Sequence, residues 1–233
     1  MAIIHDTTMS PGKLELLRAW LSAQPWYLAS GREPDLAKSG GFRLDDPAGE
    51  VGIEFMVVND RSGNRTTTYQ VPLTYRAGPL AATKDGLIGT AEHGVLGSRW
   101  IYDGTHDPVL VAQLAALIQG QAQPQAQSLS NTPDLTVISH PVAGGSLVTA
   151  GFTVAANGPF GTDLRIRTVA ADRRRNGQLL VRIHRILQSG DGTPAAGEAG
   201  RPCLSATWRL ADGTQARGVF ATAKYSQEPA AGS

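Results

Sequence analysis

The stretch that decides the fold is residues 52–75, which read GIEFMVVNDRSGNRTTTYQVPLTY. Its first part, Gly52–Val58, is apolar and β-prone, and its last part, Thr66–Tyr75, places Thr, Tyr and Val on alternating faces. Between them, Asn59–Asn64 contains the Asn, Asp, Ser and Gly residues that favour turns. The stretch therefore predicts a β-hairpin within a larger antiparallel sheet.

Two amphipathic helices are predicted, one before and one after this hairpin. Each begins at a polar residue followed by proline, Ser10-Pro11 and Asp107-Pro108, which is typical of a helix N-terminus. Pro25 ends the first helix, because a proline clashes with the preceding turn. The apolar residues at helical spacing are Leu14, Leu17, Trp20 and Leu21 in the first helix, and Val109, Leu110, Leu114, Leu117 and Ile118 in the second.

The second half of the chain has an almost entirely β pattern. Asn-Gly and Asp-Gly pairs, which close hairpins, separate its apolar runs. The predicted strands of this half are Thr136–His140, Ser146–Ala155, Leu164–Val169, Leu179–Leu187, Cys203–Leu210 and Ala216–Thr222. Two further short strands, Leu87–Thr90 and Ser98–Tyr102, precede the second helix.

These patterns predict the α+β class: a mostly antiparallel sheet with the two helices covering one face. Residues 121–133, rich in Gln, Ala, Ser and Pro, are typical of a linker or a loop. They separate a predicted α+β domain, 1–120, from a β-rich half, 134–226, whose strands either continue the first sheet or form a second unit. Residues 227–233 are small and polar and are predicted to be a disordered tail.

The composition of the chain argues against several classes of protein, among them nucleic-acid-binding and membrane proteins. The chain has 233 residues, 41% of them hydrophobic, and a formal net charge of +1, so neither nucleic acid nor an anionic membrane is an expected partner. The single cysteine, Cys203, makes no internal disulfide and no CxxC motif. The N-terminus lacks the pattern of a signal peptide, and no apolar run has the length of a membrane helix. We expect a cytoplasmic protein.

A search for catalytic motifs favours a protein that is not an enzyme. A kinase-type enzyme typically has an Asp base and, five positions later, an Asn for magnesium, and the sequence has no such pair. It also has no phosphate-binding GxxxxGK[ST] loop, no GxSxG nucleophile motif and no closely spaced histidine pair. No catalytic residue, cofactor or metal is therefore predicted.

One local cluster of titratable groups, Tyr102–Pro108, has two interpretations. Asp103, His106 and Asp107 could form a metal or acid-base site. The pattern more often indicates a strand-to-helix turn in which Asp107 caps the helix, because helix starts favour Asp. Trp26 and Tyr27 could likewise stack on a sugar ring, although aromatic residues beside a proline are more often core residues.

Three stretches together resemble the N-terminal cap of actinobacterial maltokinases, with order and approximate spacing kept over residues 10–120. They are Trp20–Tyr27, Tyr69–Arg76, and Ile88–Thr90 leading to Tyr102–Pro108. The first departs from the family pattern, since Pro25 stands at the usual arginine and Tyr27 at the usual phenylalanine. The resemblance implies a cystatin-like fold, a curved antiparallel sheet with helices packed on it.

The resemblance also bears on nucleotide binding. In maltokinases the catalytic residues lie in a much longer C-terminal part. Here Val181–Gly190 resembles the kinase strand that carries the ATP-binding lysine, but that position is Arg182. An arginine is bulkier and makes a less compact phosphate contact.

The resemblance implies a non-catalytic accessory or interaction protein of maltose or glucan kinase metabolism, whose partner is a separate kinase or a second copy of the chain. One alternative is a module that binds a small sugar or a nucleotide, and a second is a divergent enzyme related to sugar kinases. The candidate interaction residues are Trp26, Tyr27, Arg76, Asp103, His106 and Arg182.

Overall fold

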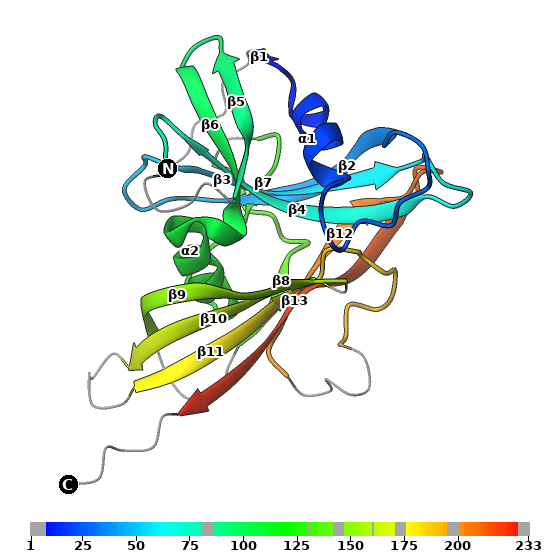
Figure 1. Cartoon of the computed structure of the whole chain (residues 1–233). Helices are drawn as coiled ribbons and strands as arrows, with labels where there is room; N and C mark the ends of the chain where they lie inside the picture. Colours follow the sequence, from blue (N-terminus) through cyan, green and yellow to red (C-terminus); the bar gives the residue numbers. More distant parts are fainter. Residues whose placement is uncertain are drawn as a thin grey trace, which may run out of the picture.

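The computed structural model describes residues 8–80, 86–129, 131–141, 147–159, 161–170, 176–194 and 201–227 (Figure 1). The first half contains β1 (Met9–Ser10), α1 (Lys13–Leu21), β2 (Leu36–Leu44), β3 (Gly52–Asp60), β4 (Thr67–Arg76), β5 (Leu87–His93), β6 (Gly97–Asp103), the 3-10 turn η1 (Gly104–His106) and α2 (Pro108–Ile118). The second contains β7 (Gln125–Ala126), β8 (Ile138–His140), β9 (Leu147–Gly158), β10 (Gly161–Ala170), β11 (Asn176–Ile183), β12 (Cys203–Arg209) and β13 (Gln215–Gln227). Apart from Gln227, the predicted tail lies outside the described residues.

The hairpin predicted from residues 52–75 is β3–β4, with antiparallel register from Gly52 opposite Tyr75 to Asp60 opposite Thr67. It lies within a strongly curved sheet whose described strands run in the order β1-β5-β6-β4-β3-β2-β12-β13-β11-β10-β9. Every described strand pair is antiparallel. The α+β class with a large curved antiparallel sheet is therefore confirmed.

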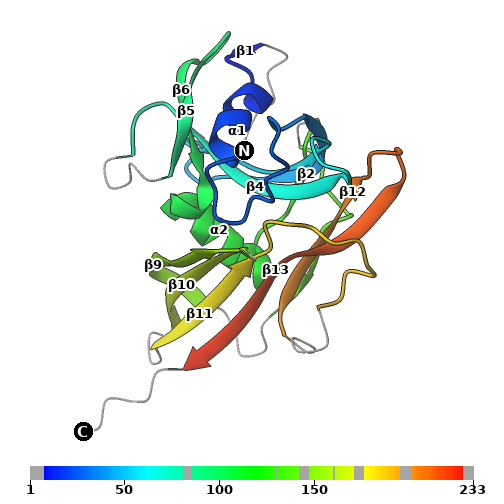
Figure 2. The same cartoon turned by 45° about the vertical axis from the view of Figure 1, so that its right-hand side comes forward.

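The helices pack on opposite faces of β3 and β4, whereas the sequence predicts them on one face. Successive side chains of a strand point to opposite sides. Ile53, Phe55 and Val57 therefore join the core around α2, while Met56 and Val58 join the core that contains Leu17 and Leu21 of α1. Figure 2 shows α1 on one side of β2 and β4 and α2 on the other. Both faces of this hairpin are apolar, so the sequence pattern gave no reason to place both helices on the same face.

The two helix starts differ from each other. Asp107 caps α2 as predicted, accepting a hydrogen bond from Val109 N at 2.9 Å. The first prediction is wrong by two residues: Gly12 is the N-cap of α1, and Ser10 instead belongs to β1, opposite Glu92 of β5. Because Ser10 pairs with β5, it does not cap the helix.

The sheet passes from the first half of the chain to the second between β2 and β12, where Gly40 lies opposite Trp208. Gly41, with φ of +125°, lies so close to β3 that a Cβ would come 2.1 Å from the Phe55 carbonyl oxygen. Only glycine fits this position. The division into domains at residues 121–133 stays a prediction; within that stretch, β7 pairs with β2.

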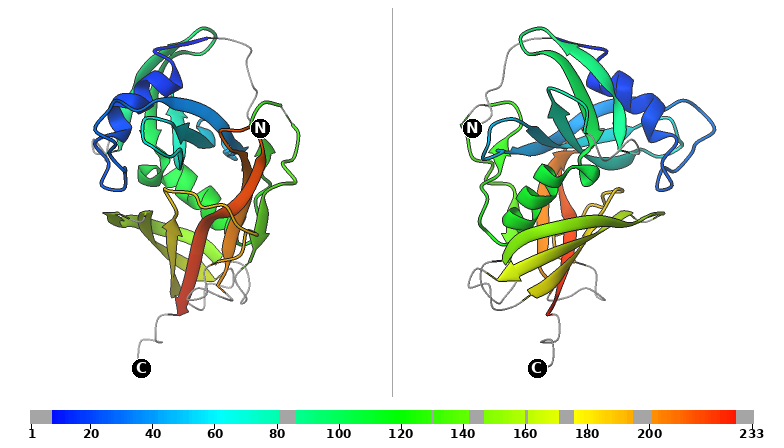
Figure 3. Two further views of the ribbon diagram at one scale, coloured as in Figure 1. Left: turned by 90° about the vertical axis from the view of Figure 1, so that its right-hand side faces the viewer. Right: turned by 60° about the vertical axis from the view of Figure 1, so that its left-hand side comes forward.

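Helix α2 lies in the hollow of the curved sheet, between β2–β4 and β9–β11 (Figure 3). Its buried residues Leu110, Val111 and Leu114 share one core with Leu164 of β10 and Val181 of β11. Burying an aliphatic side chain of this kind contributes roughly 1.5–3 kcal/mol. The second half therefore completes the cover of α2, a helix encoded in the first half.

Candidate functional site

The polar centre of the molecule is an ion pair between Asp103, at the end of β6, and Arg185, just after β11. Arg185 Nη2 lies 2.6 Å from Asp103 Oδ2, and the two side chains are 0% and 2% exposed. Arg185 Nη2 also donates to Thr105 Oγ1, and its Nε donates to Thr162 Oγ1 of β10 at 2.8 Å. These contacts join the first half of the chain to the second.

Backbone hydrogen bonds fix the position of Arg185. Gln70 N of β4 donates to Arg185 O at 2.8 Å, and Leu187 N donates to Thr68 O at 2.9 Å. The pairing of β4 with β6 runs from Leu73 to Arg76. Residues 185–187 thus pair with the earlier part of the same β4 edge, which β6 does not reach. The guanidinium lies 4.9 Å from the centre of the Trp26 ring, at cation–π distance.

A second arginine–carboxylate pair fixes the start of α2. Arg76 of β4 forms two hydrogen bonds to Asp107, at 2.6 and 2.7 Å, and these hydrogen bonds raise the pKa of Arg76. Asp107 is fully buried and also caps α2. The cap interpretation of Asp107 is therefore confirmed, and its carboxylate has an arginine partner that the sequence did not indicate.

The remaining candidates of the first half are packing residues. Trp26 is fully buried, with its ring 5.7 Å from that of Trp20 and 5.9 Å from that of Tyr69. Tyr27 donates to Asp60 Oδ2 at 2.9 Å, and burial is the main cause that raises the pKa of Tyr27. His106 packs against Gly86, where a Cβ would come within 2.6 Å of the histidine Cβ.

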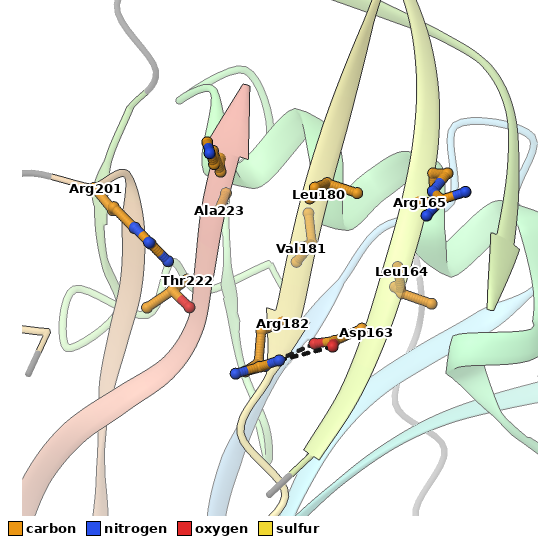
Figure 4. A pocket seen from close by; sticks show the side chains of 10 residues that line it. Asp163, Leu164, Arg165, Leu180, Val181, Arg182, Arg201, Thr222 and Ala223 are labelled. Carbon is orange, nitrogen blue, oxygen red and sulfur yellow. Dashed lines mark hydrogen bonds and ion pairs between the residues drawn. The ribbon is translucent and has the colours of Figure 1, made fainter. Parts of the chain in front are cut away.

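Arg182 lies apart from these residues, on the outer face of β11. It forms hydrogen bonds of 2.7 Å through Nε and Nη2 to the two oxygens of Asp163 on β10, and the two side chains are 46% and 36% exposed. The pair borders an open hollow over β10, β11 and β13 (Figure 4). The position that resembles the kinase lysine is thus occupied by a surface ion pair.

A second hollow lies where the loop after β11 passes β13. Its lining includes Leu28 from the first half, His184, Ile186 and Val219, and glycines of the loop. His184 Nε2 lies 3.4 Å from Thr222 Oγ1. The lining is mainly apolar and neutral, which suits an uncharged small molecule better than a phosphate.

A buried carboxylate that the sequence analysis did not single out is Glu54 of β3. It accepts hydrogen bonds from Lys13 Nζ at 2.6 Å, Tyr75 Oη at 2.6 Å and Gln127 Nε2 at 2.8 Å. Burial acts to raise the pKa of Glu54, but the charge and hydrogen bonds of Lys13 and Tyr75 outweigh it, so the pKa lies below its ordinary value. The missed signal was a Glu in the middle of an apolar strand.

Chemically, the carboxylates Asp103, Asp107 and Glu54 are each paired with a cation inside the fold. Among the described residues, His, Cys, Asp and Glu form no group of three suited to a metal ion. The geometry therefore fits structural ion pairs.

We predict that Arg185→Ala lowers the free energy of unfolding by about 3–5 kcal/mol, because it leaves the buried Asp103 carboxylate without its cation. Arg182→Ala is the matched control: it breaks an exposed arginine–aspartate pair and should cost about 0.2–1 kcal/mol. Urea unfolding at pH 7 measures both. Equal losses in the two variants would contradict a special role of the buried pair.

The lowered pKa of Glu54 predicts that the stability of the fold decreases at acidic pH. Because its pKa is lower in the folded than in the unfolded state, its contribution to stability is present above the unfolded pKa and is lost as pH falls through the folded pKa. Glu54→Gln should therefore lose less stability than the unmodified chain between about pH 5 and pH 3. Glu50→Gln, at an exposed position, is the control and should follow the unmodified chain. Urea midpoints across this range measure the difference.

Residues 20–107 match the family model of the maltokinase N-terminal cap domain. The match begins at Trp20 near the end of α1 and ends at Asp107, so it includes β2 to β6 and both partners of the Arg76–Asp107 pair. No curated protein matches the chain. Arg182 and Arg185 lie beyond the matched segment. Residues 20–107 of this chain are thus similar to the maltokinase N-terminal cap domain, and we call them the cap-type segment.

Proposed function

We propose that this chain is a non-catalytic accessory or interaction protein of sugar kinase metabolism, with a cystatin-like cap that acts on a separate kinase. The observation that carries the proposal is the match of residues 20–107 to the maltokinase cap, a segment that excludes the strand resembling the one with the kinase lysine. In this proposal the protein works in the cytoplasm through protein contacts. Within the described residues, no helix has the length and apolar character needed to cross a membrane.

The polar contacts support this proposal over the enzymatic alternative. Of the candidate interaction residues, Asp103 is paired with Arg185, Arg76 with Asp107, and Arg182 with Asp163. A phosphotransferase uses its carboxylates to hold magnesium and to orient the nucleophile. In this fold Asp103 and Asp107 cap helical turns instead.

A second candidate function, a module for a small sugar, is favoured by the hollow beside His184 and Ile186. It lies between the first half, represented by Leu28, and the loop of the second half. Clefts between parts of a fold are common sites for small ligands. A sugar bound there would contact both halves of the chain.

Ligand and partner measurements separate these functions. We expect no change in melting temperature with ATP and magnesium, and co-elution with a maltokinase of the same host on size exclusion. A ligand at about 100 times its Kd would stabilise the protein by about 2.7 kcal/mol, a shift that is easily measured. Maltose and glucosamine test the hollow in the same assay.

The outcomes assign the function. An ATP–magnesium shift that Arg182→Ala abolishes and Arg61→Ala retains would contradict the non-catalytic proposal. Arg61 is a suitable control because it forms an exposed pair with Asp35, as Arg182 does with Asp163. A shift with maltose and no kinase co-elution would favour the sugar module.

A further inference from the structure

The outer face of β10, β11 and β13 is distinct from the face that covers α2. The inward residues of these strands, such as Leu164, Val181 and Ala223, are buried in the core. Their outward neighbours form cross-strand rows. Arg165 lies opposite Leu180, which lies opposite Lys224. Asp163 lies opposite Arg182, and the row ends at Thr222, which is only 2% exposed. The alternation of the strands thus places polar side chains together on one surface.

This surface is strongly basic. We define the basic face as five exposed cationic residues, which are Arg165, Arg167, Arg182, Arg201 and Lys224. Asp163 is the carboxylate within it, and it is paired with Arg182. The five cations and Asp163 give the basic face a formal charge of +4, whereas the whole chain has a formal net charge of +1. Figure 4 shows Arg165, Arg182 and Arg201 around the hollow, with Leu180 and Thr222 between them.

We propose that the basic face binds an extended acidic segment of a protein partner. The proposal rests on the proposed function, because it assigns the surface by which an accessory protein meets its partner. Residues two apart on a strand are about 6.7 Å apart, and neighbouring strands are about 4.8 Å apart. An extended acidic segment presents alternate carboxylates at the same period as Arg165 and Arg167 of β10, so it can meet these two cations when it runs along that strand.

The Arg182–Asp163 pair is a geometric precedent for this recognition. Its two hydrogen bonds of 2.7 Å place the guanidinium and the carboxylate side by side, as bidentate arginine–carboxylate pairs are placed. A partner carboxylate over Arg165 could form the same bidentate pair in the next row, and one over Lys224 could accept a single charge-assisted hydrogen bond. Leu180, 37% exposed between these two cations, offers an apolar contact at the centre.

A protein partner fits this face better than a nucleic acid. Nucleic-acid binding relies on neutralising many phosphates in a row, and one of the five cations of the basic face, Arg182, is already paired with Asp163. Arginines around an exposed aliphatic residue are instead typical of a protein interface.

The experiment measures binding of the full chain to a fluorescein-labelled peptide of alternating glutamate and serine, by fluorescence anisotropy. The test variant is the double substitution Arg165→Glu, Lys224→Glu. The matched control is Arg32→Glu, Arg65→Glu, which makes the same charge change at two exposed arginines outside the basic face. Single-stranded DNA of equal length is the competing probe.

We expect the peptide to bind the unmodified chain and the control, and its Kd to rise at least about tenfold in the test variant, because attraction becomes repulsion. Binding should weaken between about 0.05 M and about 0.5 M salt. Absence of peptide binding, an equal loss in both variants, or tighter binding of the DNA would overturn the proposal. Circular dichroism and urea midpoints confirm that both variants are folded.

Failure of this proposal and failure of the proposed function give different results. Kinase co-elution without peptide binding would reject the basic face as the contact surface and leave the accessory function standing. Peptide binding without kinase co-elution would retain the basic face and reject the kinase as the partner.

Discussion

Two charged groups, the Asp103 carboxylate and the Arg185 guanidinium, lie 2.6 Å apart where solvent hardly reaches either of them. Removing such charges from water costs several kcal/mol for each ion, so neither residue is tolerated at this depth without the other. Asp103 comes from the cap-type segment and Arg185 from the second half. The pair therefore makes the buried edge of β4 depend on both parts of the chain.

The need to pair buried charges also explains why Asp103, Asp107 and Arg76 act as structural residues at the centre of the fold. Asp103 caps η1, and Asp107, four residues later, caps α2 and binds Arg76. Helix α2 in turn fills the hollow of the curved sheet (Figure 3). The polar pairs thus position the helix around which the second half packs. The basic face, which we propose as the contact surface for a partner, lies elsewhere, on the outer side of β10, β11 and β13.

Local patterns predicted the local structure well. The hairpin of residues 52–75 and the Asp107 cap followed from strand alternation and helix-start chemistry. The side of the sheet on which each helix packs depends on contacts between distant parts of the chain. With apolar residues on both faces of β3, periodicity alone could not decide it.

In the candidate site, too, the sequence did not predict the contacts between distant parts of the chain. Trp26, Asp103 and Arg76 were predicted as candidate interaction residues, and the sequence did not indicate the contacts that they make within the fold. Arg185 could have been found, because it continues the buried phase of Val181 and Ile183 and therefore required an anion. Nothing in the sequence specified that this anion is Asp103, 82 positions away. Such a pairing is fixed only by the path of the sheet.

We infer that the cap-type segment and the second half form one cooperative unit through the buried edge of β4. Native-state hydrogen exchange tests it most directly, by comparing amides of β4 with those of β11 and β13. We predict that the most protected amides of all three strands open with one free energy and one denaturant dependence. A lower opening free energy for β4, with its own smaller denaturant slope, would contradict the claim.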